Sequence, residues 1–478
     1  MSKAAVFKLL WILMTTFYIE QFGCRATQAD AAAIERQLRD RGFVAAGGSA
    51  CADVVIVNTC TVTAAADAQA RDAIRKLHAR NPAAQVIATG CYAQRAPEEL
   101  ASLPGVSWVV GNSHKPEIPW LMDSIAKVPA TESANGFVPA SALGEDQFSL
   151  LHGPAKILTG NIFEQREFLA APVMGGEGNH TRPVVKIQDG CNSRCAYCVI
   201  PFVRGRSRSL QPIEVIDEIT RLSASGYREI VLSGINLGTY GRDLSPRVEL
   251  IDLLRRILDE TTAERLRISS IEPMDVTEEL IALFASTDRM AQHFHMPLQS
   301  GSNRVLAAMH RWYRAEHYAR RVELIRERLP NAAIGADVIA GFPGETVAEH
   351  AETLAFIERL PFSYLHVFSF SQRPGTRAAA LPNQVPPPLV KSRARELRTL
   401  GEQKAQEFRR SQLGRVLRVL TLRQSEQSPE TTPAISSNYM QLQLRRKLPS
   451  NEWVNVLIAE RDNKIVGEIE DVVTASAV

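Results

Sequence analysis

The stretch GCNSRCAYC at residues 190–198 decides the fold of this 478-residue chain. It places Cys191, Cys195 and Cys198 in the spacing C-x3-C-x2-C within one short loop. Three thiolates this close together can hold three irons of a [4Fe–4S] cluster, which normally takes four cysteine ligands, and one iron then stays open to a substrate. A structural zinc site is the alternative, but zinc usually takes four ligands in paired C-x2-C knuckles, and no second knuckle follows. The spacing therefore favours an iron–sulfur cluster.

This motif, with the aromatic Tyr197 directly before its last cysteine, resembles the signature of the radical SAM superfamily. The resemblance implies that the open iron binds the amino and carboxylate groups of S-adenosylmethionine (SAM). It also implies that Cys191, Cys195 and Cys198 are the metal ligands at the catalytic centre, with Tyr197 beside the cofactor.

Three further cysteines share one sequence context, because Cys24, Cys60 and Cys91 each follow an expected strand. The carboxyl ends of parallel strands lie on one edge of a sheet, so topology alone would bring these thiols together. Unrelated buried cysteines are the alternative. The threefold repetition favours a second [4Fe–4S] cluster, again with an open iron. Cys51 precedes its strand, and we interpret it as a buried or incidental thiol.

The composition is that of a soluble globular protein, with 45% hydrophobic and 22% charged residues. The length allows about two to four domains. A net charge of +3 is too small to indicate a partner, although basic residues gather toward the C-terminus. Seven cysteines in so long a chain do not form a disulfide scaffold. Thiolate ligands must stay reduced, so we expect a cytoplasmic protein.

Residues 1–14 form an extension of doubtful significance. Its short apolar run resembles a signal peptide, but no cleavage site follows and the run is too short to span a membrane. Translation that starts at Met14 is the simpler interpretation. We expect no transmembrane segment elsewhere.

Strands and helices alternate over residues 15–127, which predicts a small parallel α/β domain. The expected strands are 16–21, 54–57, 85–88 and 107–110, and the expected helices are 29–41 and 64–80. Periodicity fades over residues 128–180, which we interpret as a linker.

The alternation resumes over residues 181–411 and predicts a partial (β/α)6 barrel. Its expected strands are 184–187, 229–232, 265–269, 293–296, 333–339 and 364–368, and a long helix follows at 388–410. Short β-prone runs over residues 412–475 predict a small antiparallel barrel. The fold class is therefore α/β, with an all-β domain at the C-terminus.

Nearly the whole chain resembles the radical SAM methylthiotransferases. The resemblance is carried by GCRATQ at 23–28, NTCTVT at 58–63, TGCYAQ at 89–94, KIQDGC at 186–191, RGRSRS at 204–209, PLQSGS at 297–302, DVIAGFPGET at 337–346, YLHVFSF at 364–370 and RPGT at 373–376. Three departures from the pattern touch no expected ligand: Asp30 where Glu is more common, Gln372 where Pro is common, and the foreign N-terminal extension. The last domain is similar to a TRAM domain, an RNA-binding module of this family.

The family has three branches, which act on isopentenyladenosine in tRNA, on threonylcarbamoyladenosine in tRNA, or on an aspartate of a ribosomal protein. The segments 61–63, 91–94 and 365–368 are most similar to the threonylcarbamoyladenosine branch. This implies addition of a methylthio group to C2 of the modified adenine next to the anticodon. The other two branches remain the alternatives.

The resemblance further implies two [4Fe–4S] clusters and two SAM molecules. One SAM yields a radical that removes hydrogen from C2, and the other methylates a sulfur held at the Cys24, Cys60 and Cys91 site. The implied partners are a tRNA, an electron donor such as flavodoxin or ferredoxin, and a sulfur source.

Other candidates for the site follow expected strands or lie near the terminal barrel. The candidate SAM contacts lie at the carboxyl ends of the core strands, the catalytic face of such barrels: Ser233, Gly234, Asn236, Glu272, Gln299, Ser300 and Gly341. The candidate RNA contacts are basic groups that can neutralise phosphates: Arg410, Arg415, Arg445, Arg446 and Lys447. Each has a plainer alternative as a turn, capping or solvated surface residue.

Overall fold

The computed structural model describes residues 15–125, 155–166, 168–169, 181–423, 430–461 and 464–469. The extension at 1–14 and most of the expected linker lie outside the described residues. The chain divides into two compact units, which are described separately. The first unit comprises residues 1–172, 189–193 and 198–206, and the second unit comprises the rest. Cys191 and Cys198 thus belong to the first unit and Cys195 to the second, while the expected domain boundaries at 127, 180 and 411 stay predictions.

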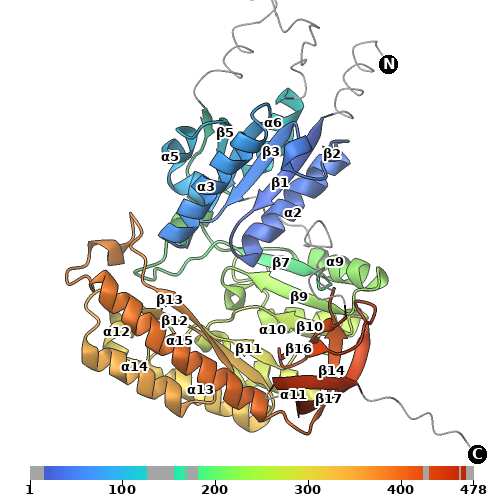
Figure 1. The fold of residues 1–478 in the computed structure, drawn as a ribbon, viewed down its shortest axis with the longest axis vertical. Coiled ribbons are helices and arrows are strands. Elements are labelled where there is room, and N and C mark those ends of the chain that lie inside the picture. The colour runs from blue at the N-terminus through green and yellow to red at the C-terminus, as the bar shows by residue number, and fades with distance from the viewer. Residues whose placement is uncertain are drawn as a thin grey trace, which may run out of the picture. The chain divides into compact units, whose positions relative to one another are not determined.

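The first unit is built on a parallel six-stranded sheet with the order β2-β1-β3-β4-β5-β6 (Figure 1). All six residues of the central strand β3 are buried, as continuous apolar runs in parallel strands require. Separate apolar clusters cover the two faces of the sheet. The strands are β1 (Thr16–Gln21), β2 (Val44–Ala45), β3 (Val54–Thr59), β4 (Gln85–Gly90), β5 (Val106–Gly111) and β6 (Lys156–Leu158).

The helices of the first unit confirm the predicted alternation. They are α2 (Arg25–Asp40), α3 (Ala64–Arg80), α4 (Cys91–Arg95), α5 (Pro97–Ala101) and α6 (Ile118–Ile125). Helix α2 starts four residues before the predicted start at position 29, because Cys24 itself stands in the extended N-cap position. The short edge strands β2 and β6 were not expected, since two and three residues carry no period.

The core of the second unit is the expected partial barrel. Two sheets, β10-β9-β7-β8 and β11-β12-β13, are joined by a bridge between Ser270 and His295. The six predicted strands are confirmed as β7 (Val184–Asp189), β9 (Glu229–Gly234), β10 (Arg265–Ile268), β11 (His293–His295), β12 (Ala333–Ala340) and β13 (Tyr364–Ser369), and β8 (Arg208–Ser209) is a short addition at the edge.

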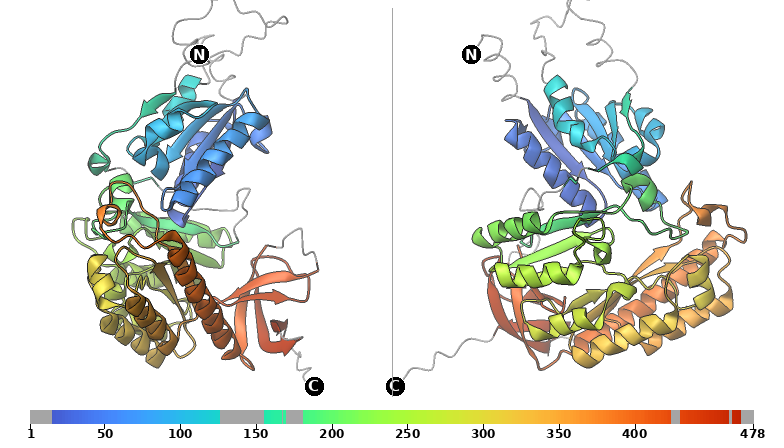
Figure 2. Two further views of the ribbon diagram at one scale, coloured as in Figure 1. Left: turned by 60° about the vertical axis from the view of Figure 1, so that its left-hand side comes forward. Right: turned by 180° about the vertical axis from the view of Figure 1, so that it is seen from behind.

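Helices that separate these strands pack on the apolar face of the sheets. They are α9 (Pro212–Ala224), α10 (Leu250–Glu260), α11 (Glu278–Ser286), α12 (Asn303–Ala308), α13 (Ala315–Arg328), α14 (Val347–Arg359) and the long α15 (Pro387–Arg410). Figure 2 shows α15 leading directly into the C-terminal barrel.

The last region closes into a five-stranded barrel with the order β14-β15-β16-β18-β17. One pair departs from the antiparallel expectation, because β16 and β18 run parallel where Leu444 lies beside Gly467. A Cβ at Gly467 would lie 2.9 Å from the Leu444 side chain, so a glycine permits this approach. The strands are β14 (Val416–Thr421), β15 (Thr432–Ser436), β16 (Gln441–Leu444), β17 (Trp453–Arg461) and β18 (Lys464–Ile469).

A buried acid at the start of β9 ties this barrel to the core. Glu229 accepts hydrogen bonds from Arg265 Nε at 2.5 Å and from Arg267 Nε at 2.7 Å. The same arginines donate to main-chain oxygens of the barrel, Arg265 to Ile435 at 3.2 Å and Arg267 to Ser436 at 3.0 Å. We call these three side chains the Glu229 anchor.

Among the described residues, no helix combines the length and the apolar character that a membrane crossing requires.

Candidate functional site

The cysteine loop follows β7, as predicted, and its sulfurs receive hydrogen bonds. In the first unit, the backbone N–H of Ser193 donates to Cys191 Sγ at 3.4 Å. In the second unit, Arg311 Nη1 donates to Cys195 Sγ at 3.4 Å. N–H donors to ligand sulfurs are among the features that set the reduction potential of iron–sulfur clusters. These contacts therefore suit a cluster at this loop.

The first unit brings Cys24, Cys60 and Cys91 together, as parallel topology predicts. Cys24 caps α2 after β1, Cys60 follows β3, and Cys91 opens α4 after β4. The three strands are adjacent and parallel, with β3 in the middle. Their carboxyl ends therefore deliver three thiols to one edge of the sheet.

Two glycines allow these loops to approach each other. Gly23 has φ +101°, and a Cβ there would lie 2.8 Å from Cys60 Sγ. Gly90 has φ +102°, and a Cβ there would lie 2.3 Å from the carbonyl oxygen of Thr59. Any side chain at either position would displace the thiol or its strand, so both positions require glycine.

The three thiols lie close enough to influence one another electrostatically. Burial, and then the proximity of Cys91 and Cys24, raise the pKa of the Cys60 thiol to about 12. A bound metal reverses this preference, because a coordinating thiol is deprotonated outright. Asn112 Nδ2 also lies 3.5 Å from Cys91 Sγ as a donor. All seven cysteines are free thiols, so no disulfide competes for these sulfurs.

Cys51 was expected to be a buried or an incidental thiol. It lies in a short 3-10 helix before β3, away from the carboxyl edge, as predicted, but it is exposed rather than buried. Of the two interpretations, the structure leaves the incidental thiol.

The candidate SAM contacts all lie in the second unit, at or just beyond the carboxyl ends of its strands. Ser233 and Gly234 end β9, and the N–H of Asn236 donates to Gln188 Oε1 at 2.8 Å. Gln299 holds a positive φ of 64°, rare for a residue with a side chain. The remaining candidates lie in the corresponding turns: Glu272 after β10, Ser300 beyond β11, Gly341 after β12, and Tyr197 in the cysteine loop.

Arg311 joins Glu272 to Cys195 of the cysteine loop and was missed from the sequence. Its guanidinium is paired with Glu272 and contacts Cys195 Sγ, and its side chain is only 5% exposed. Burial would lower the pKa of Arg311, but the surrounding Tyr313, Tyr197 and Glu272 hold it well above the ordinary value. Arg311 therefore supplies a permanent positive charge beside the cysteine loop.

A polar chain lines one face of β11–β13. The hydroxyl of Tyr364 lies 2.8 Å from His293 Nε2 and 2.9 Å from His295 Nδ1. Asp337 Oδ1 lies 2.9 Å from His295 Nε2 and 3.3 Å from His366 Nδ1. His295 is buried within the strand, whereas His366 is 56% exposed.

These side chains form one hydrogen-bonded network on the face of the sheet. The ligand atoms of His295, Asp337 and His366 lie within 4.8 Å of one another, a spacing that a metal ion could bridge. Each of these groups already has a partner within the chain, however. Burial alone would raise the pKa of Asp337, but hydrogen bonds with the two histidines hold it well below its ordinary range.

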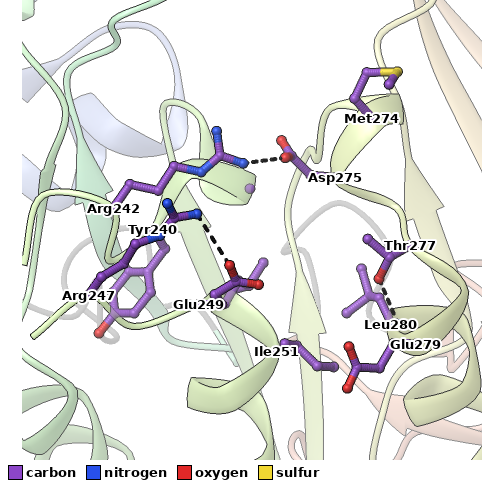
Figure 3. Close-up of a pocket in the computed structure, with 12 residues that line it drawn as sticks. Tyr240, Arg242, Arg247, Glu249, Ile251, Met274, Asp275, Thr277, Glu279 and Leu280 are labelled. Carbon is purple, nitrogen blue, oxygen red and sulfur yellow. Dashed lines mark hydrogen bonds and ion pairs between the residues drawn. The ribbon is translucent and has the colours of Figure 1, made fainter.

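A separate hollow of about 220 Å³ lies between the segments that follow β9 and β10 (Figure 3). Arg242 pairs with Asp275 at 2.7 Å and Arg247 with Glu249 at 3.2 Å, so the charges in its wall are neutralised. None of the candidate SAM contacts is among the residues that line it. It is therefore distinct from the candidate SAM site.

The basic residues proposed for RNA contact are all exposed around the terminal barrel. They are Arg410 at the end of α15, Arg415 before β14, and Arg445, Arg446 and Lys447 after β16. Two aromatic residues of the terminal region already have partners within the second unit. Tyr439 stacks on His293 with centroids 4.3 Å apart, and Arg265 and Arg418 each lie 4.3 Å from the ring of Trp453.

Two family models match this chain. One is described as uncharacterized protein family UPF0004 and covers residues 16–111, and the other is the radical SAM superfamily and covers residues 185–357. A solved structure of the radical SAM methyltransferase TsrM from Kitasatospora setae has a TM-score of 0.53 and 16% identity, with 77% of each chain covered. At that identity the likeness shows the fold alone. Fold and cysteine loop together define a radical SAM enzyme.

Curated relatives narrow the class. A protein of Aquifex aeolicus described as threonylcarbamoyladenosine tRNA methylthiotransferase MtaB is 36% identical over 92% of this chain and 99% of its own length. The Bacillus subtilis protein of the same description is 34% identical over 90% of each chain. A tRNA-2-methylthio-N(6)-dimethylallyladenosine synthase of Syntrophomonas wolfei is 33% identical over 95% of this chain and 97% of its own. This chain belongs to the radical SAM methylthiotransferase family, whose members use SAM and a [4Fe–4S] cluster.

Replacement of Arg311 by methionine is expected to slow reductive SAM cleavage by about tenfold to a hundredfold, the usual cost of losing a partner of a metal ligand. The change removes the donor to Cys195 Sγ and leaves Glu272 without its cation. Formation of 5′-deoxyadenosine under anaerobic conditions measures the effect. Arg314→Met, an exposed arginine three positions away, is the control and should cleave SAM at the wild-type rate.

Proposed function

We propose that this protein transfers a methylthio group to C2 of N6-threonylcarbamoyladenosine next to the anticodon of tRNA. The observation that carries the proposal is the match to a threonylcarbamoyladenosine tRNA methylthiotransferase along 99% of that relative's length. The two cysteine groups of the chain supply the metal sites that such a transfer needs.

The chain's own residues take distinct parts in the reaction. Cys191, Cys195 and Cys198 would hold the cluster. With SAM bound, that cluster would supply a radical able to remove hydrogen from the unactivated C2 carbon. Arg311 fixes one of these sulfurs and orients Glu272 at the candidate SAM site. Glycine permits close packing at two of the candidate SAM contacts, since a Cβ at Gly341 would lie 2.5 Å from the Val390 side chain and a Cβ at Gly234 would lie 3.0 Å from Gln188 Cβ.

In this proposal, Cys24, Cys60 and Cys91 would hold a second [4Fe–4S] cluster. That cluster would carry the sulfur to be transferred. The convergence of the three thiols at one edge of the sheet, the donor to Cys91 and the two close-packed glycines support a site shaped for a metal group. An electron donor such as flavodoxin or ferredoxin and a separate sulfur source complete the reaction, which we place in the cytoplasm.

The terminal barrel is the proposed TRAM module that binds tRNA. Its exposed arginines and lysine can neutralise phosphates, and its anchoring to the core keeps bound RNA at a fixed place relative to the SAM site.

A second candidate substrate is isopentenyladenosine in tRNA. The observation that favours it is the 33% identity to a 2-methylthio-N(6)-dimethylallyladenosine synthase over 95% of this chain. The substrates differ only in the group on N6, so one experiment separates them.

Nucleoside mass spectrometry of tRNA from a deletion strain tests the proposal. We expect loss of the 2-methylthio form of threonylcarbamoyladenosine and accumulation of threonylcarbamoyladenosine without the methylthio group. The wild-type gene should reverse both changes. Loss of the 2-methylthio form of isopentenyladenosine instead would assign the second substrate. An unchanged nucleoside profile would reject both tRNA assignments.

A further inference from the structure

Four charged side chains are enclosed within the first unit. Lys115 Nζ lies 2.8 Å from Asp30 Oδ2, and Arg204 Nη2 lies 2.9 Å from the same oxygen. Arg204 Nη1 lies 2.9 Å from Asp189 Oδ1 and 3.1 Å from its Oδ2. The four side chains are between 2% and 9% exposed. We call Asp30, Lys115, Asp189 and Arg204 the buried ion cluster.

Three of the four members stand close in sequence to a predicted cluster ligand. Asp30 lies in α2, which begins directly after Cys24, and Asp189 lies two residues before Cys191. Arg204 follows Cys198 by six residues. The buried ion cluster therefore joins the segment that carries Cys191 and Cys198 to the helix that Cys24 caps.

Further contacts join the residues after Cys198 to the loop of Cys91. Asn112 Nδ2 lies 3.5 Å from Cys91 Sγ and donates to the carbonyl oxygen of Val203 at 2.7 Å. Cys91 also packs against Val199 and Val203 in one apolar cluster. The residues that follow Cys198 are thus held against the Cys91 loop by polar and apolar contacts.

The turn before Cys191 is also held in place, by close packing and by a backbone hydrogen bond. Gly190 has φ +69°, and a Cβ there would lie 2.0 Å from the carbonyl oxygen of Arg206. The N–H of Cys191 donates to the carbonyl oxygen of Gly205 at 3.1 Å. A side chain at Gly190 would separate the two ends of the cysteine loop.

Stability alone does not account for the buried ion cluster. Burial of charges is costly, and replacement of such groups by apolar residues of similar volume is often neutral or stabilising. The charges also lie near the second cysteine trio, since Arg204 interacts electrostatically with Cys24, Cys60 and Cys91. Apolar residues in place of the buried ion cluster would not supply a positive charge beside the sulfurs, and they would not fix the position of the cysteine loop.

We propose that the buried ion cluster is a positioning device that holds the loop of Cys191 and Cys198 against the Cys24, Cys60 and Cys91 site, with Arg204 as a fixed positive charge beside that site. Arg204 acts through the cysteines and is a positioning residue. The inference rests on the proposed second cluster. It adds that residues outside both cysteine trios set how firmly that cluster is held and how readily it is reduced.

The test uses the full chain with Cys191, Cys195 and Cys198 replaced by alanine, so that iron can bind only at the second trio. After anaerobic reconstitution, two quantities are measured: the rate of iron release to a chelator and the midpoint potential in an EPR-monitored titration. Arg204→Met in this background is expected to release iron about tenfold to a hundredfold faster, as loss of outer-shell partners does. Its midpoint potential should fall, because a positive charge beside the cluster has been removed.

The matched control is Arg265→Met in the same background. Arg265 is also a buried arginine paired with a carboxylate, but it lies in the second unit. It should lower the melting temperature at least as much as Arg204→Met and leave iron release and potential unchanged. If Arg204→Met fails to fold, Arg204→Lys replaces it, since lysine keeps the charge but cannot bridge both carboxylates.

The outcomes separate cleanly. Faster iron release in the Arg204 variant, with the Arg265 control unchanged, supports the inference. Release and potential equal to those of the parent, with only stability lost, overturn it and leave the second cluster in place. A parent protein that binds no iron overturns the second cluster itself, and the inference with it.

Discussion

Replacement of Cys24, Cys60 and Cys91 together by alanine is expected to leave a protein that cleaves SAM but makes no methylthiolated nucleoside. The variant should hold about half of the wild-type iron, because one of two four-iron clusters is lost. Its cysteine loop at 190–198 is unchanged, so 5′-deoxyadenosine should still form. Iron and sulfide quantification, SAM cleavage and nucleoside analysis of the tRNA product measure the three effects.

The converse triple variant, with alanine at Cys191, Cys195 and Cys198, should lose both SAM cleavage and product. Cys51→Ala is the matched control, because Cys51 is an exposed cysteine outside both trios and should be silent in all three assays. Wild-type iron content, or methylthiolated product, from the Cys24, Cys60 and Cys91 variant would contradict the proposed sulfur-carrying site.

Replacement of Glu229 by glutamine should destabilise the second unit by about 3–5 kcal/mol, the usual cost of leaving a buried charge without its partner. Glu229 is fully buried and pairs with Arg265, Arg267 and Arg182. The amide cannot neutralise the two arginines that hold the terminal barrel. Denaturant unfolding of both proteins at neutral pH measures the difference.

The same pair of proteins should differ in pH dependence. Burial alone would raise the pKa of Glu229, but Arg267, Arg265 and Arg182 hold it well below its ordinary range. A lowered pKa in the folded state stabilises the fold above the unfolded pKa of about 4.3, and this contribution is lost as the pH falls further. Wild-type stability should therefore decline below about pH 4 more steeply than that of Glu229→Gln.

Glu264→Gln is the control for the Glu229 prediction. Glu264 pairs with Arg228 and Arg418 beside the barrel, but its side chain is 40% exposed. Exposed pairs contribute about 0–1 kcal/mol. A loss of stability as large as that of Glu229→Gln would show that the barrel interface as a whole, and not the buried acid, is responsible.

Much of this fold could be predicted because its signals are local. Continuous apolar runs such as β3 identify buried parallel strands, and the placement of Cys24, Cys60 and Cys91 after three such strands predicts their convergence without side-chain detail. The edge strands β2, β6 and β8 were missed, since runs of two or three residues at the margin of a sheet carry no period. The parallel contact of β16 with β18 was missed because it depends on the closure of the barrel.

The supporting residues of the site could not be predicted, because they meet only through the folded chain. Asp30 and Arg204 are 174 positions apart, and Arg311 reaches Cys195 across 116. Nothing in the local sequence distinguishes Arg204 from the neighbouring Arg206, which is exposed. A partial signal existed in the run RGRSRS, whose arginines border the cysteine motif, but the partner of each arginine is a property of the fold.

Strand β9 connects the attachment point of the terminal barrel to the candidate SAM site, and its length sets the distance between them. Glu229, which fastens the terminal barrel, begins the strand, and Gly234, a candidate SAM contact, ends it. Five residue steps of about 3.3 Å give a span of about 17 Å. If the barrel binds RNA, β9 fixes the distance between the bound RNA backbone and the candidate SAM site. The adenosine that is modified would then be selected by its distance from that backbone as well as by its chemical identity.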